Sequence, residues 1–138
     1  MSKRYIVATA LYCAFIFGLS STSKPSEIEL PFMFEGLDKA AHLVLYAGLA
    51  AVVSVGIRRA EKPATPWFQC FFPILFAAGY GLTDEIHQLF VPMRQFDFAD
   101  LMADTAGAAL VQCYLCYRWW ERPGKRNAGL QARTSTDG

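Results

Sequence analysis

The chain has 138 residues and a formal net charge of +1 at pH 7; 54% of its residues are hydrophobic and only 18% are charged. Soluble domains average about 25% charged residues, and a chain this apolar is not disordered. The near-zero net charge argues against a nucleic-acid partner, which would require a basic face. The length allows one domain.

Four hydrophobic blocks, taken in chain order, determine the predicted fold: residues 5–19, 40–57, 67–82 and 101–120. A membrane-spanning helix needs roughly 20 apolar residues, with a range of about 17–25. A soluble bundle would instead carry a charged stripe on each helix, and the first and third blocks contain no charged residue. The pattern predicts an all-α, membrane-embedded four-helix bundle. A signal peptide over the first block is the alternative for that segment.

Basic residues gather in the segments on one side of this predicted bundle. Of the 13 lysines and arginines, only Lys24, Lys39 and Arg94 fall in the opposite segments, 21–39 and 83–100. The positive-inside rule then predicts that both termini are cytoplasmic. Residues 1–122 form the predicted transmembrane domain, and residues 123–138 form a basic, disordered cytoplasmic tail.

Prolines and aspartates mark the predicted helix boundaries. The proline-containing segment 21–35 predicts an irregular outer loop, after which Asp38 is placed to cap the second helix. Pro92 ends the third helix, and Asp97 or Asp100 begins the fourth.

Polar residues recur at helical spacing near the outer ends of three of the predicted helices. Such groups are costly in a bilayer and usually face a cavity or one another. The set comprises Asp38, Lys39, His42 and Tyr46 on the second helix, Asp84, Glu85, His87 and Gln88 on the third, Asp97, Asp100 and Asp104 on the fourth, and Arg94 in the turn between the last two. Asp84, His87 and Gln88 are predicted to share one face, with Glu85 beside them. We expect a polar pocket open to the outer side; the alternative is that these groups only hold the helices together.

This arrangement resembles the VanZ-like family of small bacterial membrane proteins. The likeness rests on LDKAAHLVLYAGLA around His42, on GLTDEIHQLFVPMRQFD and on FDFADLMADTAGAAL, within residues 38–107. Met93 and Asp104 stand where this family commonly has glycine and asparagine. The resemblance implies a multi-pass protein of the bacterial inner membrane with a link to the cell envelope. The family is named for a protein associated with low-level resistance to the glycopeptide teicoplanin.

The sequence is compatible with three functions. The first is binding of an envelope lipid headgroup or a glycopeptide-type ligand, for which the binding residues are Asp38, Lys39, Tyr46, Gln88, Arg94, Asp97, Asp100 and Asp104. The second is a hydrolase or transferase acting on a lipid or lipid-linked precursor, for which the catalytic candidates are His42, Asp84, Glu85 and His87. The third is a small transporter subunit, which four short helices would form only as a homo-oligomer.

The cofactor is left open by the sequence. The candidate is a divalent cation such as Mg²⁺ or Ca²⁺ held by hard oxygen ligands, and its candidate ligands are Asp84, Glu85, Asp100 and Asp104. Zn²⁺ is not expected, because it favours more nitrogen ligands and the sequence has only two histidines.

Overall fold

The computed structural model describes residues 1, 3–22, 31–62 and 64–120, without the side chains of residues 31–35 and 120. This part of the chain forms four helices and no strand: α1 (Lys3–Ser20), α2 (Pro31–Arg58), α3 (Pro66–Gln88) and α4 (Phe98–Trp120). The predicted all-α class is confirmed. The predicted disordered tail, residues 123–138, lies outside the described residues.

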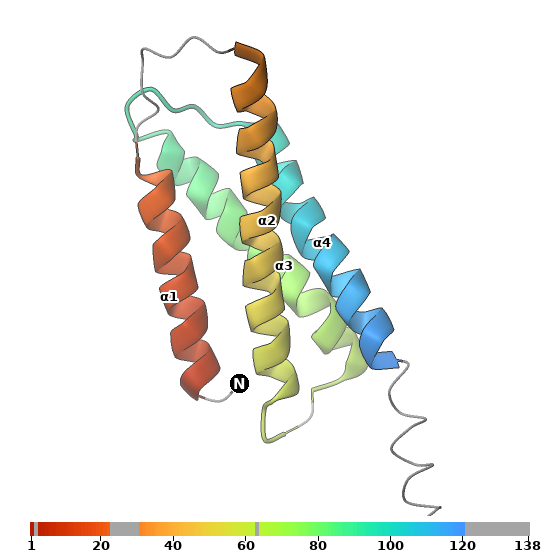
Figure 1. Cartoon of the computed structure of the whole chain (residues 1–138). Helices are drawn as coiled ribbons and strands as arrows, with labels where there is room; N and C mark the ends of the chain where they lie inside the picture. Colours follow the sequence, from red (N-terminus) through yellow and green to blue (C-terminus); the bar gives the residue numbers. More distant parts are fainter. Residues whose placement is uncertain (2, 23–30, 63, 121–138) are drawn as a thin grey trace, which may run out of the picture.

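The four helices run alternately up and down (Figure 1). The start of α1, the end of α2, the start of α3 and the end of α4 therefore lie at one end of the bundle. We call it the basic end, because its charged side chains include Lys3, Arg4, Arg58, Arg59 and Arg118. The opposite end, which we call the acidic end, includes Asp38, Asp84, Glu85, Asp97 and Asp100.

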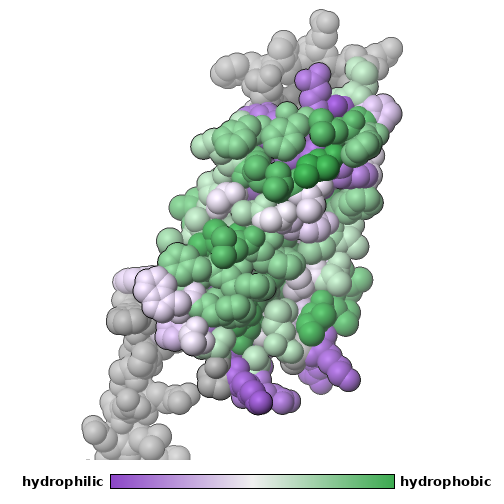
Figure 2. All heavy atoms as spheres, turned by 180° about the vertical axis from the view of Figure 1, so that it is seen from behind, coloured by the Kyte–Doolittle hydropathy of each residue, from purple (hydrophilic) through white to green (hydrophobic). Residues whose placement is uncertain are grey.

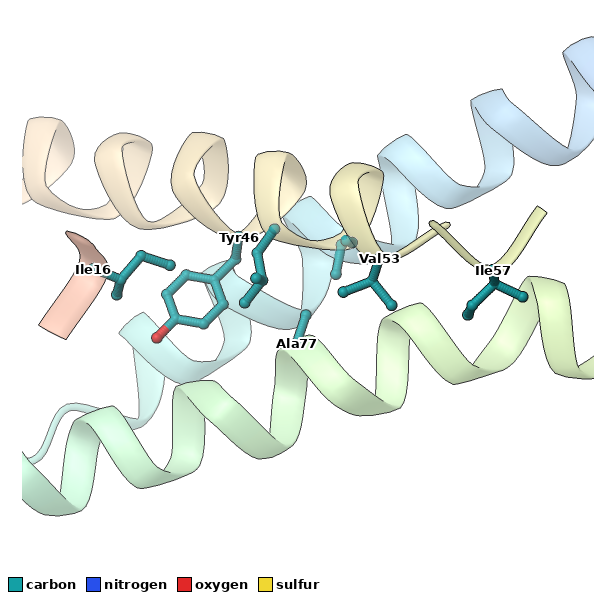
Figure 3. Packing of buried hydrophobic residues seen from close by; sticks show 8 residues of the cluster. Ile16, Tyr46, Val53, Ile57 and Ala77 are labelled. Atoms are coloured by element: carbon teal, nitrogen blue, oxygen red, sulfur yellow. The ribbon is translucent and has the colours of Figure 1, made fainter. Parts of the chain in front are cut away.

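A small apolar cluster holds the middle of the bundle together. It contains Ile16 of α1, Ala77 of α3 and, from α2, Tyr46, Val53 and Ile57 (Figure 3). These three α2 residues are seven and four positions apart, so that they lie on one face of the helix. This face lies inside the bundle and fixes the rotation of α2 about its own axis.

The backbones of α2 and α4 approach each other closely at Gly107. A Cβ atom at this position would collide with the main-chain carbonyl of Leu43. Because a backbone carbonyl cannot move aside as a flexible side chain can, glycine is required here for the two helices to meet. This contact brings the half of α2 at the acidic end, with His42, against the first turns of α4.

A proline inside α3 leaves one main-chain carbonyl without its helical partner. Pro73 has no N–H to donate to the carbonyl of Gln69 four residues earlier. The Gln112 side chain of α4 supplies the missing donor, with Nε2 lying 2.8 Å from Gln69 O. Gln112 is only 1% exposed, so this hydrogen bond links α3 to α4 away from solvent.

The structure corrects two predicted helix boundaries. The second helix begins at Pro31, so Asp38 lies inside α2 and does not cap it. Proline is well tolerated in the first turn of a helix, where its missing N–H needs no partner. The third helix ends at Gln88, earlier than Pro92, because the chain turns there through main-chain hydrogen bonds such as Phe90 N to His87 O.

The start of the fourth helix agrees with one of the two predicted aspartates. Asp97 immediately precedes α4, and its Oδ1 accepts a hydrogen bond from Ala99 N at 2.8 Å. Its carbonyl accepts from Asp100 N and Leu101 N. These contacts are those of an N-capping residue.

Many large apolar side chains lie on the surface of the bundle, and several acidic side chains lie inside it. Large apolar side chains such as Leu11, Leu75 and Leu110 are exposed, whereas Glu85 and Asp104 are fully buried. The face in Figure 2 is largely hydrophobic along the middle of the bundle, with hydrophilic residues toward its two ends. Within the described residues, one helix is long and apolar enough to cross a membrane by itself, the segment Gly36–Arg58 of α2.

Candidate functional site

The imidazole of His42 is held between two carboxylates of α4 at the acidic end. His42 Nδ1 lies 3.0 Å from Asp104 Oδ1, and Nε2 lies 4.0 Å from Asp100 Oδ2. An ionised carboxylate can only accept hydrogen bonds, so Nδ1–H donates to Asp104, and in the neutral ring Nε2 then carries the lone pair. Asp100 and Asp104 are four residues apart and therefore lie one above the other on α4, which explains how both reach the same ring.

Glu85 joins α3 to this pair and is fully buried. Its Oε1 accepts a hydrogen bond from Gln88 Nε2 at 3.0 Å, and its Oε2 accepts one from Asp97 N at 2.9 Å. Glu85 thereby fixes the start of α4 relative to the end of α3. We refer to His42, Glu85, Asp100 and Asp104 together as the His42 cluster.

Lys39 lies at the rim of this cluster. Its ammonium group is 3.1 Å from Asp97 Oδ2 and 3.5 Å from Asp100 Oδ1. The side chains of Lys39 and Asp97 are 39% and 46% exposed. Exposed ion pairs stabilise a fold by about 0–1 kcal/mol, so we regard this pair as the edge of the site and not its centre.

A polar cavity of about 140 Å³ lies beside His42, between α1, α2 and α3. Its apolar wall is formed by Ile16, Leu19 and Leu45. Its polar wall is formed by Ser20, Asp38, His42, Tyr46, Asp84, Gln88 and Arg94. The cavity therefore gathers residues from three helices and from the turn that follows α3.

Four buried polar atoms around this cavity have no hydrogen-bond partner among the described residues: Ser20 Oγ, Tyr46 Oη, Asp84 Oδ1 and Arg94 Nε. Buried polar groups are nearly always hydrogen-bonded, and each exception calls for an explanation. The rest of the Arg94 guanidinium is engaged, with Nη1 3.5 Å from Gln88 Oε1 and Nη2 3.3 Å from Thr22 O. A ligand with both donors and acceptors would satisfy the four atoms.

His87 does not join the other candidate residues. Its Nε2 lies 3.1 Å from Ser21 Oγ, and its ring lies against Phe17 with centroids 4.3 Å apart. It therefore contacts the end of α1 and is not among the residues that line the cavity. The prediction that Asp84, His87 and Gln88 share one face of α3 is therefore corrected. The buried residues are Asp84, Glu85 and Gln88, whereas His87 is only half-buried.

The first helix contributes a site residue that the sequence did not indicate. Ser20 is 7% exposed and lines the polar cavity at the end of α1. A serine at the end of an apolar block has no distinguishing spacing, and its role depends on where α1 packs. No signal in the sequence separates Ser20 from the serines that follow it.

Known proteins relate to this chain at the level of a family. Among curated proteins, none matches it. No solved structure matches it either. Residues 4–121, which include nearly all of the four helices, match the VanZ/LLP1 family. This match agrees with the resemblance found in the three polar segments of the sequence, and the chain belongs to the VanZ/LLP1 family.

Proposed function

We propose that this protein spans the bacterial cytoplasmic membrane with four helices and binds a zwitterionic lipid headgroup at its acidic end. The membrane assignment is supported by exposed apolar side chains on all four helices, including Leu11, Val44, Leu75 and Leu110. Lipid would cover this surface, whereas in water an apolar surface of this extent would be a site of association.

The charge distribution supports an orientation with both termini in the cytoplasm. Arg58, Arg59 and Arg118 belong to the basic end, and cytoplasmic segments are enriched in such residues. The guanidinium of Arg58 lies 3.6 Å from the centre of the Trp119 ring. Tryptophans concentrate at the membrane interface, so this pair favours a headgroup-level position for the basic end. The acidic end then faces the outer leaflet.

The observation that carries the binding proposal is a pair of unsatisfied groups of opposite charge in one cavity. Asp84 Oδ1 and Arg94 Nε are both buried without a hydrogen-bond partner among the described residues, and both residues line the polar cavity. An ammonium group would donate to Asp84, and a phosphate would accept from Arg94. Ethanolamine phosphate carries both groups, so phosphatidylethanolamine is the lipid that we propose.

The size of the cavity favours a headgroup over a glycopeptide. Drug-sized ligands occupy pockets of about 300–1,000 Å³, whereas this cavity has about 140 Å³. A headgroup fits with its acyl chains outside among the lipids, next to the apolar wall formed by Leu19 and Leu45. A whole glycopeptide does not fit.

Thermal unfolding in nanodiscs tests this proposal. The full chain is placed in phosphatidylglycerol discs with an increasing fraction of phosphatidylethanolamine, and the unfolding midpoint is recorded. A ligand present at 100 times its Kd stabilises the folded state by about 2.7 kcal/mol, so we expect the midpoint to rise and to saturate. Asp84→Asn should abolish this rise.

Glu61→Gln is the matched control for the nanodisc experiment. It makes the same kind of carboxylate-to-amide change at an exposed residue in the loop between α2 and α3. This variant should keep the full response to phosphatidylethanolamine. A midpoint that is independent of phosphatidylethanolamine in the unmodified chain, or an equal response from Asp84→Asn, would refute headgroup binding at this cavity.

A second candidate function, lipid hydrolysis, is favoured by the geometry of His42. A histidine whose Nδ1–H is held by a carboxylate presents Nε2 as a general base, and His42 both lines the cavity and contacts Asp104. In the same nanodiscs, an enzyme would release ethanolamine or its phosphate with time, and His42→Gln would stop this release. Saturable binding of phosphatidylethanolamine without release of any product would support the binding function over hydrolysis.

A further inference from the structure

We propose that His42, Glu85 and Asp100 form a binding site for one divalent first-row metal ion, such as Zn²⁺ or Mn²⁺. Each residue offers one ligand atom, and these three atoms lie within 4.8 Å of one another. The three residues come from α2, α3 and α4, and all are buried. This site shares His42 with the lining of the polar cavity. It does not depend on the proposed headgroup, but a metal on Nε2 would exclude that atom as a general base.

The orientation of the imidazole is the first independent argument for a metal. Metal-binding histidines almost always donate their other ring N–H to a carboxylate or a carbonyl, which fixes the tautomer and the direction of the ligating nitrogen. Asp104 Oδ1 accepts in this way from His42 Nδ1 at 3.0 Å. The ligating nitrogen is then Nε2, which is the atom on the side of Asp100.

The charge balance is the second argument. Asp84, Glu85, Asp100 and Asp104 are 3%, 0%, 4% and 0% exposed. Among the described residues, the lysine or arginine within ion-pair distance of these four carboxylates is Lys39, which is 3.5 Å from Asp100 and half-exposed, and His42 adds a positive charge only when it is protonated. Asp84 Oδ1 and Asp104 Oδ2 have no hydrogen-bond partner among the described residues. Buried carboxylates without compensating charge are strongly unfavourable, and a divalent ion would provide that compensation.

The ligand set indicates which ions fit. One imidazole nitrogen with two carboxylates leaves at least one position for water, which is typical of zinc and manganese sites. Mg²⁺ and Ca²⁺ prefer oxygen ligands alone, so they should bind His42 poorly. This changes the ligand set expected from the sequence, which consisted of carboxylates only, because the fold turns His42 toward Glu85 and Asp100.

Metal titration of the full chain tests the existence of the site. The protein is purified in detergent, treated with EDTA and titrated by calorimetry with Zn²⁺, Mn²⁺ and Mg²⁺, and its metal content is measured by elemental analysis. We expect one Zn²⁺ or Mn²⁺ to bind per chain. Mg²⁺ should bind at least about 100-fold more weakly than these ions. Absence of stoichiometric binding of any of these ions overturns the proposal. Because no phosphatidylethanolamine is present, failure of headgroup binding does not affect this result.

Variants of the cluster test its location. Glu85→Gln and Asp100→Asn should each abolish stoichiometric binding, whereas Glu61→Gln should bind as the unmodified chain does. Asp104→Asn removes only the residue that orients His42 and should lower the affinity by about 10–100-fold. Unchanged binding in all three cluster variants overturns the assignment.

Two glycines of α3 give a test that leaves every ligand in place. A Cβ atom at Gly81 would lie 2.6 Å from Asp104 Oδ2, whereas one at Gly79 would have nothing within 4 Å. Gly81→Ala should therefore displace Asp104 and weaken metal binding, and Gly79→Ala should not. Equal metal affinity of the two folded variants would contradict the role of Asp104.

Discussion

Met93 shows how a single residue carries strain at the acidic end. Its φ of 64° lies in the left-handed region, which costs a residue with a side chain about 1–2 kcal/mol relative to glycine. The side chain is 69% exposed, so packing does not offset this cost. This positive φ explains why glycine is common at this position in the VanZ-like family.

Replacing Met93 by glycine should stabilise the protein. We expect Met93→Gly to raise the free energy of unfolding by about 1 kcal/mol, measured by denaturant titration in detergent. The control is Met102→Gly, the same change at an exposed position inside α4, which should lower stability by about 1 kcal/mol. A change of the same sign in both variants would show that the backbone of Met93 is not the cause.

At the scale of the helices, the proline of α3 and the glutamine of α4 form one unit. Pro73 frees the Gln69 carbonyl, and Gln112 Nε2 donates to it. Hydrogen bonds between membrane helices are individually modest, about 0.6 kcal/mol on average. Removing the hydrogen bond from Gln112 to the Gln69 carbonyl should cost more stability than this average when the carbonyl has no other donor.

A double-mutant cycle measures this dependence. Gln112→Leu should destabilise the chain by about 1–2 kcal/mol when Pro73 is present, because it leaves a buried carbonyl unsatisfied. In the Pro73→Ala background the new N–H of residue 73 restores the helical hydrogen bond, and the cost should fall by at least about 0.5 kcal/mol. If Gln112→Leu costs the same stability in both backgrounds, Gln112 does not compensate for the missing N–H of Pro73.

At the scale of the whole molecule, the two oppositely charged ends make the proposed orientation testable. In a chain whose four cysteines have been replaced by alanine, Met93→Cys places one thiol at the acidic end and Glu61→Cys places one at the basic end. A membrane-impermeant maleimide should label the first variant in intact spheroplasts, and the second only after permeabilisation. The reverse pattern would invert the topology, and equal labelling of both variants would contradict a spanning bundle.

Several features follow from the sequence because they are local. The hydrophobic blocks are enough to predict four helices and an all-α fold, since helix formation depends on periodicity within one segment. The spacing of Asp38, His42 and Tyr46 likewise places them on one face of α2, because residues four apart are neighbours on any helix. The capping preference of aspartate limits the start of α4 to Asp97 or Asp100, and the structure shows that Asp97 is the capping residue.

Other features were decided only by the tertiary structure, because they depend on how each helix is rotated against its neighbours. The rotation of α3 buries Glu85 against α4 and leaves His87 on α1, although both residues belong to the same polar segment. The close approach at Gly107 brings His42 onto Asp104, and the end of α1 adds Ser20 to the cavity. Helix rotation is set by side-chain packing between segments distant in the sequence, and no pattern within one segment contains that information.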